Sequence, residues 1–160
     1  MRIAIGSDHA GFQLKDELAL FLRGLGHEVE DLGTYTDASV DYPDFARLVA
    51  EEVASGRAER GILICGTGMG MGIAANKVKG IRAAVAHDEY TAEMARRHND
   101  ANILALGSRV LTPELAKRVV QVWVNTGFDG GRHAERLAKI ERLESDDCPD
   151  AGAPEGQEQR

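Results

Sequence analysis

The sequence has few cysteines and no long apolar run, and each of these features excludes a class of protein. The two cysteines are Cys65, in a predicted core strand, and Cys148, in a polar tail. They form a poor disulfide pair, which fits a reducing compartment. No stretch approaches the roughly 20 apolar residues that span a membrane, and residues 1–5 resemble a strand more than a signal peptide. We therefore expect a cytoplasmic protein that does not enter a membrane.

Positive charge and metal-binding motifs are also scarce. The formal net charge of −7 argues against nucleic acid or an anionic membrane as the main partner. The histidines show no metal-ligand spacing and there is no CxxC motif, so no metal site is predicted. The glycine-rich segment after Cys65 lacks the spacing of the dinucleotide fingerprint and of the phosphate-binding P-loop, which weakens a nucleotide-binding domain as an alternative. We expect no cofactor.

Short apolar segments alternate with amphipathic segments along residues 1–144. The apolar segments are rich in Ile, Val, Leu and Ala without strict alternation, which is typical of buried parallel strands, and the amphipathic ones predict helices. This order predicts one domain, a three-layer α/β/α sandwich with a Rossmann-like five-stranded parallel sheet. The acidic segment 145–160 is poor in apolar residues, so we expect it to be a disordered tail. Strands are expected at 2–6, 27–31, 61–65, 81–86 and 102–106, and helices at about 14–25, 44–55, 73–77, 89–97, 113–124 and 131–144.

Cys65 is the strongest candidate for a reactive group. It ends the apolar segment 61–65 and precedes a turn with glycine at every second position from 66 to 72. The N–H groups of such a turn can bind an oxyanion, and a thiol at the start of a helix can ionise more readily and act as a base. The alternative is a tight packing turn beside an inert buried cysteine, and these residues alone do not decide between the two.

Further polar residues follow the other predicted strands. Ligands of open α/β sheets bind beyond the carboxyl ends of the strands, so these residues are expected to gather at one edge. Arg132 and Arg136, one turn apart on the last helix, suit a phosphate between them, although a solvated helix face is the alternative. The residues at the strand ends are Ser7, Asp8, His9, His87, Asp88, Ser108 and Arg109, and the long connection after the second strand contains Asp41, Tyr42 and Pro43.

Several segments between residue 1 and about 144 match the pattern of one family. They are 6–12 (GSDHAGF), 41–43 (DYP), 61–77 (GILICGTGMGMGIAANK), 97–102 (RHNDAN), 107–109 (GSR) and 130–133 (GGRH), together with Arg136. On these motifs the chain resembles the type B ribose-5-phosphate isomerases, a group that also contains six-carbon phosphosugar isomerases. The resemblance implies a cofactor-free enzyme that interconverts ribose 5-phosphate and ribulose 5-phosphate through a cis-enediolate, a step of the pentose phosphate pathway.

The resemblance also implies roles for individual residues. Cys65 is expected to be the base that moves a proton between C1 and C2, Thr67 to help hold the oxyanion, and His98 to open the furanose ring. Some relatives use a glutamate later in the glycine loop instead of a cysteine, but here that position is Met71. The residues expected to bind substrate are Asp8, His9, Tyr42, Gly66, Gly68, Met69, Gly70, Asn99, Arg109, Arg132 and Arg136.

The predicted order of elements also implies a shared site. His98 and Asn99 follow a helix that runs back along the sheet, so they fall near the amino edge of the fifth strand. Five strand residues span about 17 Å, too far for these side chains to reach Cys65 of the same chain. We expect them, with Arg132 and Arg136, to serve the neighbouring subunit of a two-fold homodimer, and the resemblance allows a dimer or a pair of dimers. A six-carbon substrate, such as allose 6-phosphate or galactose 6-phosphate, and a non-catalytic phosphosugar-binding module are the alternatives.

Overall fold

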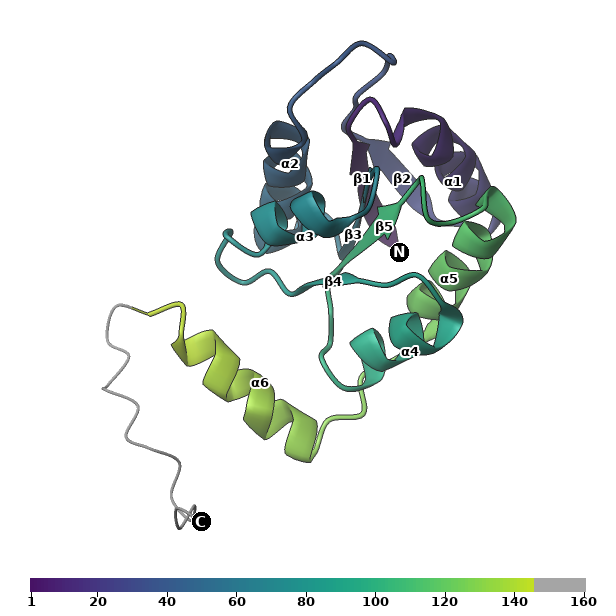
Figure 1. Cartoon of the computed structure of the whole chain (residues 1–160). Helices are drawn as coiled ribbons and strands as arrows, with labels where there is room; N and C mark the ends of the chain where they lie inside the picture. Colours follow the sequence, from purple (N-terminus) through teal and green to yellow (C-terminus); the bar gives the residue numbers. More distant parts are fainter. Residues whose placement is uncertain (146–160) are drawn as a thin grey trace, which may run out of the picture. The chain divides into compact units, whose positions relative to one another are not determined.

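The computed structural model describes residues 1–145 of the chain, in two units (Figure 1). The first unit spans Met1–Asp129 and the second begins at Gly130. The predicted tail lies outside the described residues except for Ser145, and the expected single domain over 1–144 stays a prediction. None of the helices in residues 1–145 has the length and the apolar character that crossing a membrane requires.

The first unit is built on one parallel sheet. Its strands lie in the order β2-β1-β3-β5-β4, and every neighbouring pair is parallel. The central strands β1, β3 and β5 are short and apolar because helices cover both faces of the sheet, whereas the edge strand β2 is acidic and only partly buried. The strands are β1 (Arg2–Ser7), β2 (Glu28–Asp31), β3 (Arg60–Cys65), β4 (Ala83–Val85) and β5 (Ile103–Gly107).

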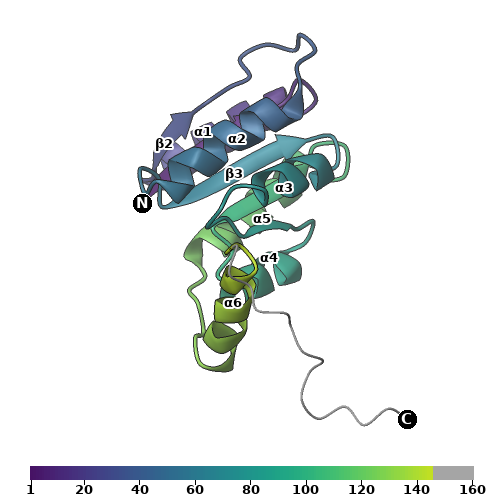
Figure 2. The same cartoon turned by 90° about the vertical axis from the view of Figure 1, so that its left-hand side faces the viewer.

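Helices cover the two faces of this sheet (Figures 1 and 2). On one face α1 (Phe12–Gly24), α4 (Glu89–Arg97) and α5 (Pro113–Asn125) bury leucine, valine, alanine and tryptophan side chains against the strands. On the other face α2 (Tyr42–Ala54) and α3 (Met69–Ala75) enclose a second apolar cluster. The predicted three-layer α/β/α sandwich with a Rossmann-like parallel sheet is therefore confirmed.

One predicted boundary was wrong by four residues, and the fourth strand was predicted two residues too long at its start and one at its end. The helix after the glycine-rich turn begins at Met69 and not at residue 73. It starts at once because Gly68, with φ of +81°, ends the turn in a left-handed conformation, and Met71 and Ala75 then pack into the core. The fourth strand spans only Ala83–Val85, and it lies at the sheet edge with β5 as its one partner strand.

The second unit consists of α6 (Arg132–Arg142) and its flanking residues. Gly130 and Gly131 precede the helix with φ of +67° and +56°, a region that glycine enters without a steric penalty. The helix therefore starts at Arg132, close to the predicted start at residue 131.

Candidate active site

Cys65 is the last residue of β3 and lies at the border between the core and the glycine-rich turn. It is 5% exposed and belongs to the apolar cluster on the α2–α3 face, with Leu63 and Met71. Its Sγ accepts a hydrogen bond from the backbone N–H of Gly68 at 3.2 Å. The turn thus folds back onto the sulfur, and a ligand must lie directly against this turn to reach it.

The turn at 66–68 rests on the carboxyl end of β5. A Cβ atom at Gly107 would lie 2.9 Å from backbone atoms of Thr67, so only glycine fits under the turn. The N–H of Ser108 donates to the Cys65 carbonyl at 2.8 Å, and the N–H of Arg109 donates to the Gly66 carbonyl at 3.0 Å. Because these contacts hold the turn in place, its backbone can act as a preorganised cradle for an anion.

Tyr42 and Arg109 lie against the two ends of this turn. A Cβ atom at Gly70 would meet the Tyr42 ring at 2.7 Å, and one at Gly66 would meet Nη1 of Arg109 at 3.2 Å. Tyr42 comes from the start of α2 and Arg109 from the segment after β5. The fold therefore brings an aromatic ring and a guanidinium group to the same short segment that follows Cys65.

Asp8 and His9 follow β1, the strand beside β3. The backbone N–H of Asp8 donates to the carbonyl of Ile64, and its buried carboxylate accepts a hydrogen bond from the N–H of Gly11 at 3.0 Å. Nδ1 of His9 accepts a hydrogen bond from the N–H of Val40 at 3.3 Å. A neutral His9 ring therefore carries its proton on Nε2, which makes that nitrogen a donor for an anionic ligand.

Thr67 and Met69 are exposed residues of the same segment. Met69 is 53% exposed, and its N–H donates to Oγ1 of Thr67 at 3.4 Å. Both side chains therefore lie at the surface of the turn, where a ligand could contact them.

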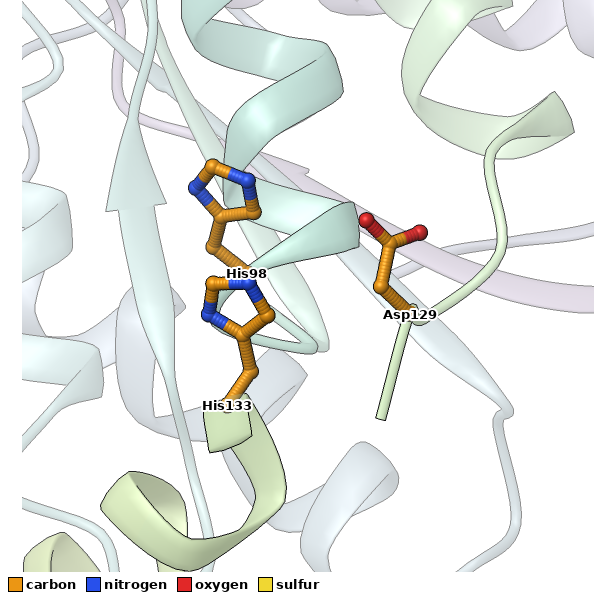
Figure 3. Close-up of side chains that lie close together, drawn as sticks. All are labelled: His98, Asp129 and His133. Carbon is orange, nitrogen blue, oxygen red and sulfur yellow. The ribbon is translucent and has the colours of Figure 1, made fainter. Parts of the chain in front are cut away.

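His98 and Asn99 lie at the opposite edge of the sheet, as the order of elements predicts. His98 caps the carboxyl end of α4 (Figure 3), and β5 begins only at Ile103. Ile103 pairs with Gly61, at the far end of β3 from Cys65. Four residues of strand separate these two ends, about 13 Å, so one chain does not bring His98 and Cys65 together.

Arg132 and Arg136 lie on α6, in the second unit. Both are exposed and stand one helical turn apart, as the sequence predicts. Their expected role in binding a phosphate stays a prediction.

Lys15 is a supporting residue that the sequence analysis missed. Its fully buried ammonium group pairs with Asp31, at the end of β2, and with Asp16. Asp31 in turn accepts a hydrogen bond from the N–H of Gly33, whose carbonyl accepts one from the N–H of Ser7 at 2.7 Å. Lys15 therefore anchors the segment that borders Asp8. The sequence contained one signal of its burial, because Lys15 lies three residues before the buried Leu18 and therefore on the same face of α1.

Asp88 fixes the start of α4. Its carboxylate accepts hydrogen bonds from the backbone N–H of Thr91 at 2.6 Å and from the Thr91 hydroxyl at 2.8 Å. These bonds stabilise the ionised form and lower the pKa of the Asp88 carboxyl below its ordinary value.

Within the first unit, residues 1–129, no three His, Cys, Asp or Glu side chains gather as a set of metal ligands.

Comparisons with known proteins give relatives that match over most of their length. Ribose-5-phosphate isomerase B of Escherichia coli is 50% identical over 143 residues, which cover 89% of this chain and 96% of that protein. A structure of ribose-5-phosphate isomerase B from Clostridium thermocellum is 58% identical, with a TM-score of 0.89, and covers 90% of this chain and 97% of the other. A structure of the Mycoplasma genitalium enzyme with bound ribulose-5-phosphate is 47% identical, with a TM-score of 0.86, over 89% and 95% of the two chains.

The sequence model described as Ribose/Galactose Isomerase matches residues 3–140. The match covers the strands of the sheet except Arg2, the turn after Cys65 and most of α6. The chain therefore belongs to the ribose/galactose isomerase family.

Proposed function

We propose that this chain is a cofactor-independent aldose–ketose isomerase that interconverts D-ribose 5-phosphate and D-ribulose 5-phosphate. The observation that carries the proposal is the contact between Sγ of Cys65 and the N–H of Gly68, inside a turn bordered by Tyr42 and Arg109. It joins a possible base to main-chain donors in one place. The names of the relatives, and the ribulose-5-phosphate bound to one of them, support a five-carbon sugar phosphate as the substrate.

The proposed chemistry is a proton transfer between adjacent carbons. The Cys65 thiolate takes the proton from C2 of the open-chain aldose, and the electrons of that bond form the cis-enediolate. The resulting thiol returns the proton to C1, while a proton moves from O2 to O1. Backbone N–H groups at 66–70, with Thr67, stabilise the negative oxygen. One such donor typically contributes about 10²–10³ to turnover, and a general base about 10²–10⁴.

The remaining site residues are proposed to hold the sugar phosphate. In one chain, Arg109 and Nε2 of His9 supply donors for phosphate oxygens, which suit the fork of a guanidinium group. Asp8 and Tyr42 contact the sugar beside the turn. The thiolate must stay reduced for this mechanism, so we propose that the protein works in the cytoplasm.

We propose that His98, Asn99, Arg132 and Arg136 complete the site of a neighbouring subunit in a homodimer. The support is the position of His98 and Asn99 at the amino edge of the sheet, away from Cys65 of their own chain. In a two-fold dimer each chain can donate this edge to its partner's site. A pair of such dimers would contain the same shared site.

Removal of the sulfur tests the mechanism. Cys65→Ala should abolish the conversion of ribose 5-phosphate, followed as ribulose 5-phosphate formation, because the base is lost. Calorimetric affinity for ribose 5-phosphate should change by only a few-fold, since the phosphate contacts remain. Cys148→Ala is the matched control and should keep wild-type turnover. A Cys65→Ala enzyme with most of its turnover would remove Cys65 from the mechanism.

Subunit mixing tests the shared site. Cys65→Ala and Arg136→Ala subunits are each expected to be inactive alone. A heterodimer of the two should contain one intact site, because both changes fall in the other site. Activity should therefore return on mixing after dissociation and reassembly, and a mixture that stays inactive argues against sharing.

A six-carbon substrate is kept as the second candidate because the matching family includes galactose isomerases. A comparison of kcat/KM for ribose 5-phosphate, allose 6-phosphate and galactose 6-phosphate, with a chelator present, decides between them. A larger value for either six-carbon sugar would replace the five-carbon assignment.

A further inference from the structure

The backbone is unusual directly after His98 and Asn99. Among residues 1–145, Asp100 is the one non-glycine residue in the left-handed region, with φ of +43°. Aspartate tolerates this region better than most residues, but it adopts it only where the surroundings hold it there. Strained backbone of this kind is often found at functional sites, so we asked what holds Asp100.

Two arginines hold Asp100 from opposite sides of its carboxylate. Nη2 of Arg82, which precedes β4, donates to Oδ2 at 3.2 Å, and Nη2 of Arg96, in the last turn of α4, lies 2.9 Å from Oδ1. The Arg96 side chain is 8% exposed, the Arg82 side chain 21% and the Asp100 side chain 34%, so both ion pairs are partly shielded from water. Shielding strengthens these bonds relative to surface ion pairs.

The same guanidinium groups also bind the backbone of the turn. Nε of Arg82 donates to the carbonyl of Asn99 at 3.1 Å and to that of Asp100 at 3.2 Å. Nη1 of Arg96 donates to the carbonyl of Ala101 at 2.7 Å. Three consecutive carbonyl groups, at 99, 100 and 101, therefore point at two arginines, and the peptide planes of the turn cannot rotate without breaking these bonds.

This arrangement fixes the backbone of His98 and Asn99, and with it the directions in which their side chains extend from the chain. The N–H of His98 is held from the helix side, by the carbonyl of Met94 at 2.9 Å. The carbonyl of Asn99 is held from the other side by Arg82. Two residues with both flanking peptides fixed have little freedom beyond rotation of their side chains.

We propose that Arg82, Arg96 and Asp100 form a positioning clamp for His98 and Asn99. The clamp keeps the imidazole of His98 at the place where it transfers protons to and from the ring oxygen and the C1 hydroxyl of the furanose form. This inference rests on the proposed function, and it takes from the family resemblance the expected role of His98 in opening the furanose ring. The clamp residues act through His98 and do not touch the substrate.

Two variants loosen the clamp in different ways: one keeps Asp100 and its strained backbone, and the other replaces Asp100 by a residue for which a positive φ carries no strain. Arg82→Met removes every clamp bond of one arginine at similar side-chain length. Asp100→Gly removes the carboxylate while it permits a positive φ, so this variant loses the clamp but not the turn. Arg57→Met is the matched control, because Arg57 makes a comparable fork to Glu52 on the exposed end of α2.

Two measurements separate ring opening from proton transfer at carbon. The first is conversion of ribose 5-phosphate, which exists mainly as a ring. The second is exchange of deuterium from D₂O into C1 of ribulose 5-phosphate, an open-chain ketose, which needs the base and the oxyanion site but no ring step. His98→Ala sets the reference for loss of the ring step and should lower conversion far more than exchange.

The clamp variants should follow the His98 pattern. A displaced catalytic group loses about ten- to a hundred-fold in rate, so Arg82→Met and Asp100→Gly should lower conversion by that factor and change deuterium exchange by less than about threefold. Arg57→Met should change neither. Arg82→Lys, which retains one donor, should recover part of the conversion rate.

The results distinguish the clamp from the proposed function. Conversion and exchange that fall together in Arg82→Met and Asp100→Gly would mean a purely structural role and overturn the clamp. A wild-type ratio of conversion to exchange in both variants, with a lowered ratio in His98→Ala, would overturn the clamp alone. A normal ratio of conversion to exchange in His98→Ala would remove ring opening from His98 and overturn the clamp, whereas the proposed function fails only if Cys65→Ala keeps its turnover.

Discussion

Gly107 supports the glycine-rich turn from below, and its replacement by alanine should slow catalysis more than it unfolds the protein. The added Cβ would lie 2.9 Å from three backbone atoms of Thr67, whereas ordinary contacts begin at 3.4 Å. Backbone atoms cannot rotate away as a side chain can, so the turn must move by at least the difference, about 0.5 Å. The same turn holds the N–H of Gly68 at 3.2 Å from Sγ of Cys65.

The expected size of the effect follows from that displacement. A misplacement of about 1 Å in an active site can lower the rate about a hundred-fold, so a shift of half that size should lower kcat about tenfold. Overpacking of a well-packed region typically destabilises by about 1–3 kcal/mol. We therefore expect a folded Gly107→Ala enzyme with a KM near the wild-type value, because the proposed phosphate contacts of His9 and Arg109 are unchanged, and with kcat reduced about tenfold.

The assay compares kcat and KM for ribose 5-phosphate with urea unfolding of the same samples. Gly24→Ala is the matched control, since a Cβ at Gly24 would have no atom within 4 Å. This variant should keep its kcat and gain up to about 1 kcal/mol, because alanine favours a helix more than glycine does. A folded Gly107→Ala enzyme whose kcat lies within twofold of the wild type would refute the argument that the turn must be held in place.

Two further predictions concern the supports of the site. Lys15→Met should lower the free energy of unfolding by about 3–5 kcal/mol, because it leaves Asp31 without its buried partner, and Asp31→Asn should restore part of the loss. The exposed ion pair between Lys117 and Glu17 provides the control, since Lys117→Met should lower the free energy of unfolding in urea by less than about 1 kcal/mol. The Asp88 cap should stabilise the protein above pH about 4 and lose this effect as the pH falls through its lowered pKa, because a protonated carboxyl accepts the Thr91 hydrogen bonds poorly. Unfolding of Asp88→Asn, followed against pH, should lack that part of the acid dependence, and an unchanged acid limb would contradict it.

Local signals predicted most of the secondary structure. The helix 89–97 was placed at its observed bounds, and Thr112 caps the next helix by accepting a hydrogen bond from the N–H of Leu115 at 3.3 Å, with Pro113 at the first position. The start of α3 was wrong because glycine has a low helix propensity, whereas packing of Met71 and Ala75 against the sheet overrides that preference.

The candidate site was predictable where it depends on sequence order. Cys65 at a strand end, followed by a glycine turn, is visible from the pattern of residues 61–72. The separation of His98 from Cys65 also follows from the alternation of helices and strands in a parallel sheet. The clamp around Asp100 was not predictable, because Arg82 and Arg96 approach it from different elements and no spacing rule relates them.

The sequence by itself determined the layered parallel fold, the strand that ends in Cys65 and the absence of glycine-loop motifs for nucleotides, because these depend on periodicity and on neighbours along the chain. Only the tertiary structure decided that Gly107 lies under Thr67, that Tyr42 and Arg109 lie against the ends of the turn, and that Lys15 pairs with Asp31. The physical reason is that such contacts join residues far apart in the sequence. Their geometry depends on how the strands pair and how closely the backbones approach one another.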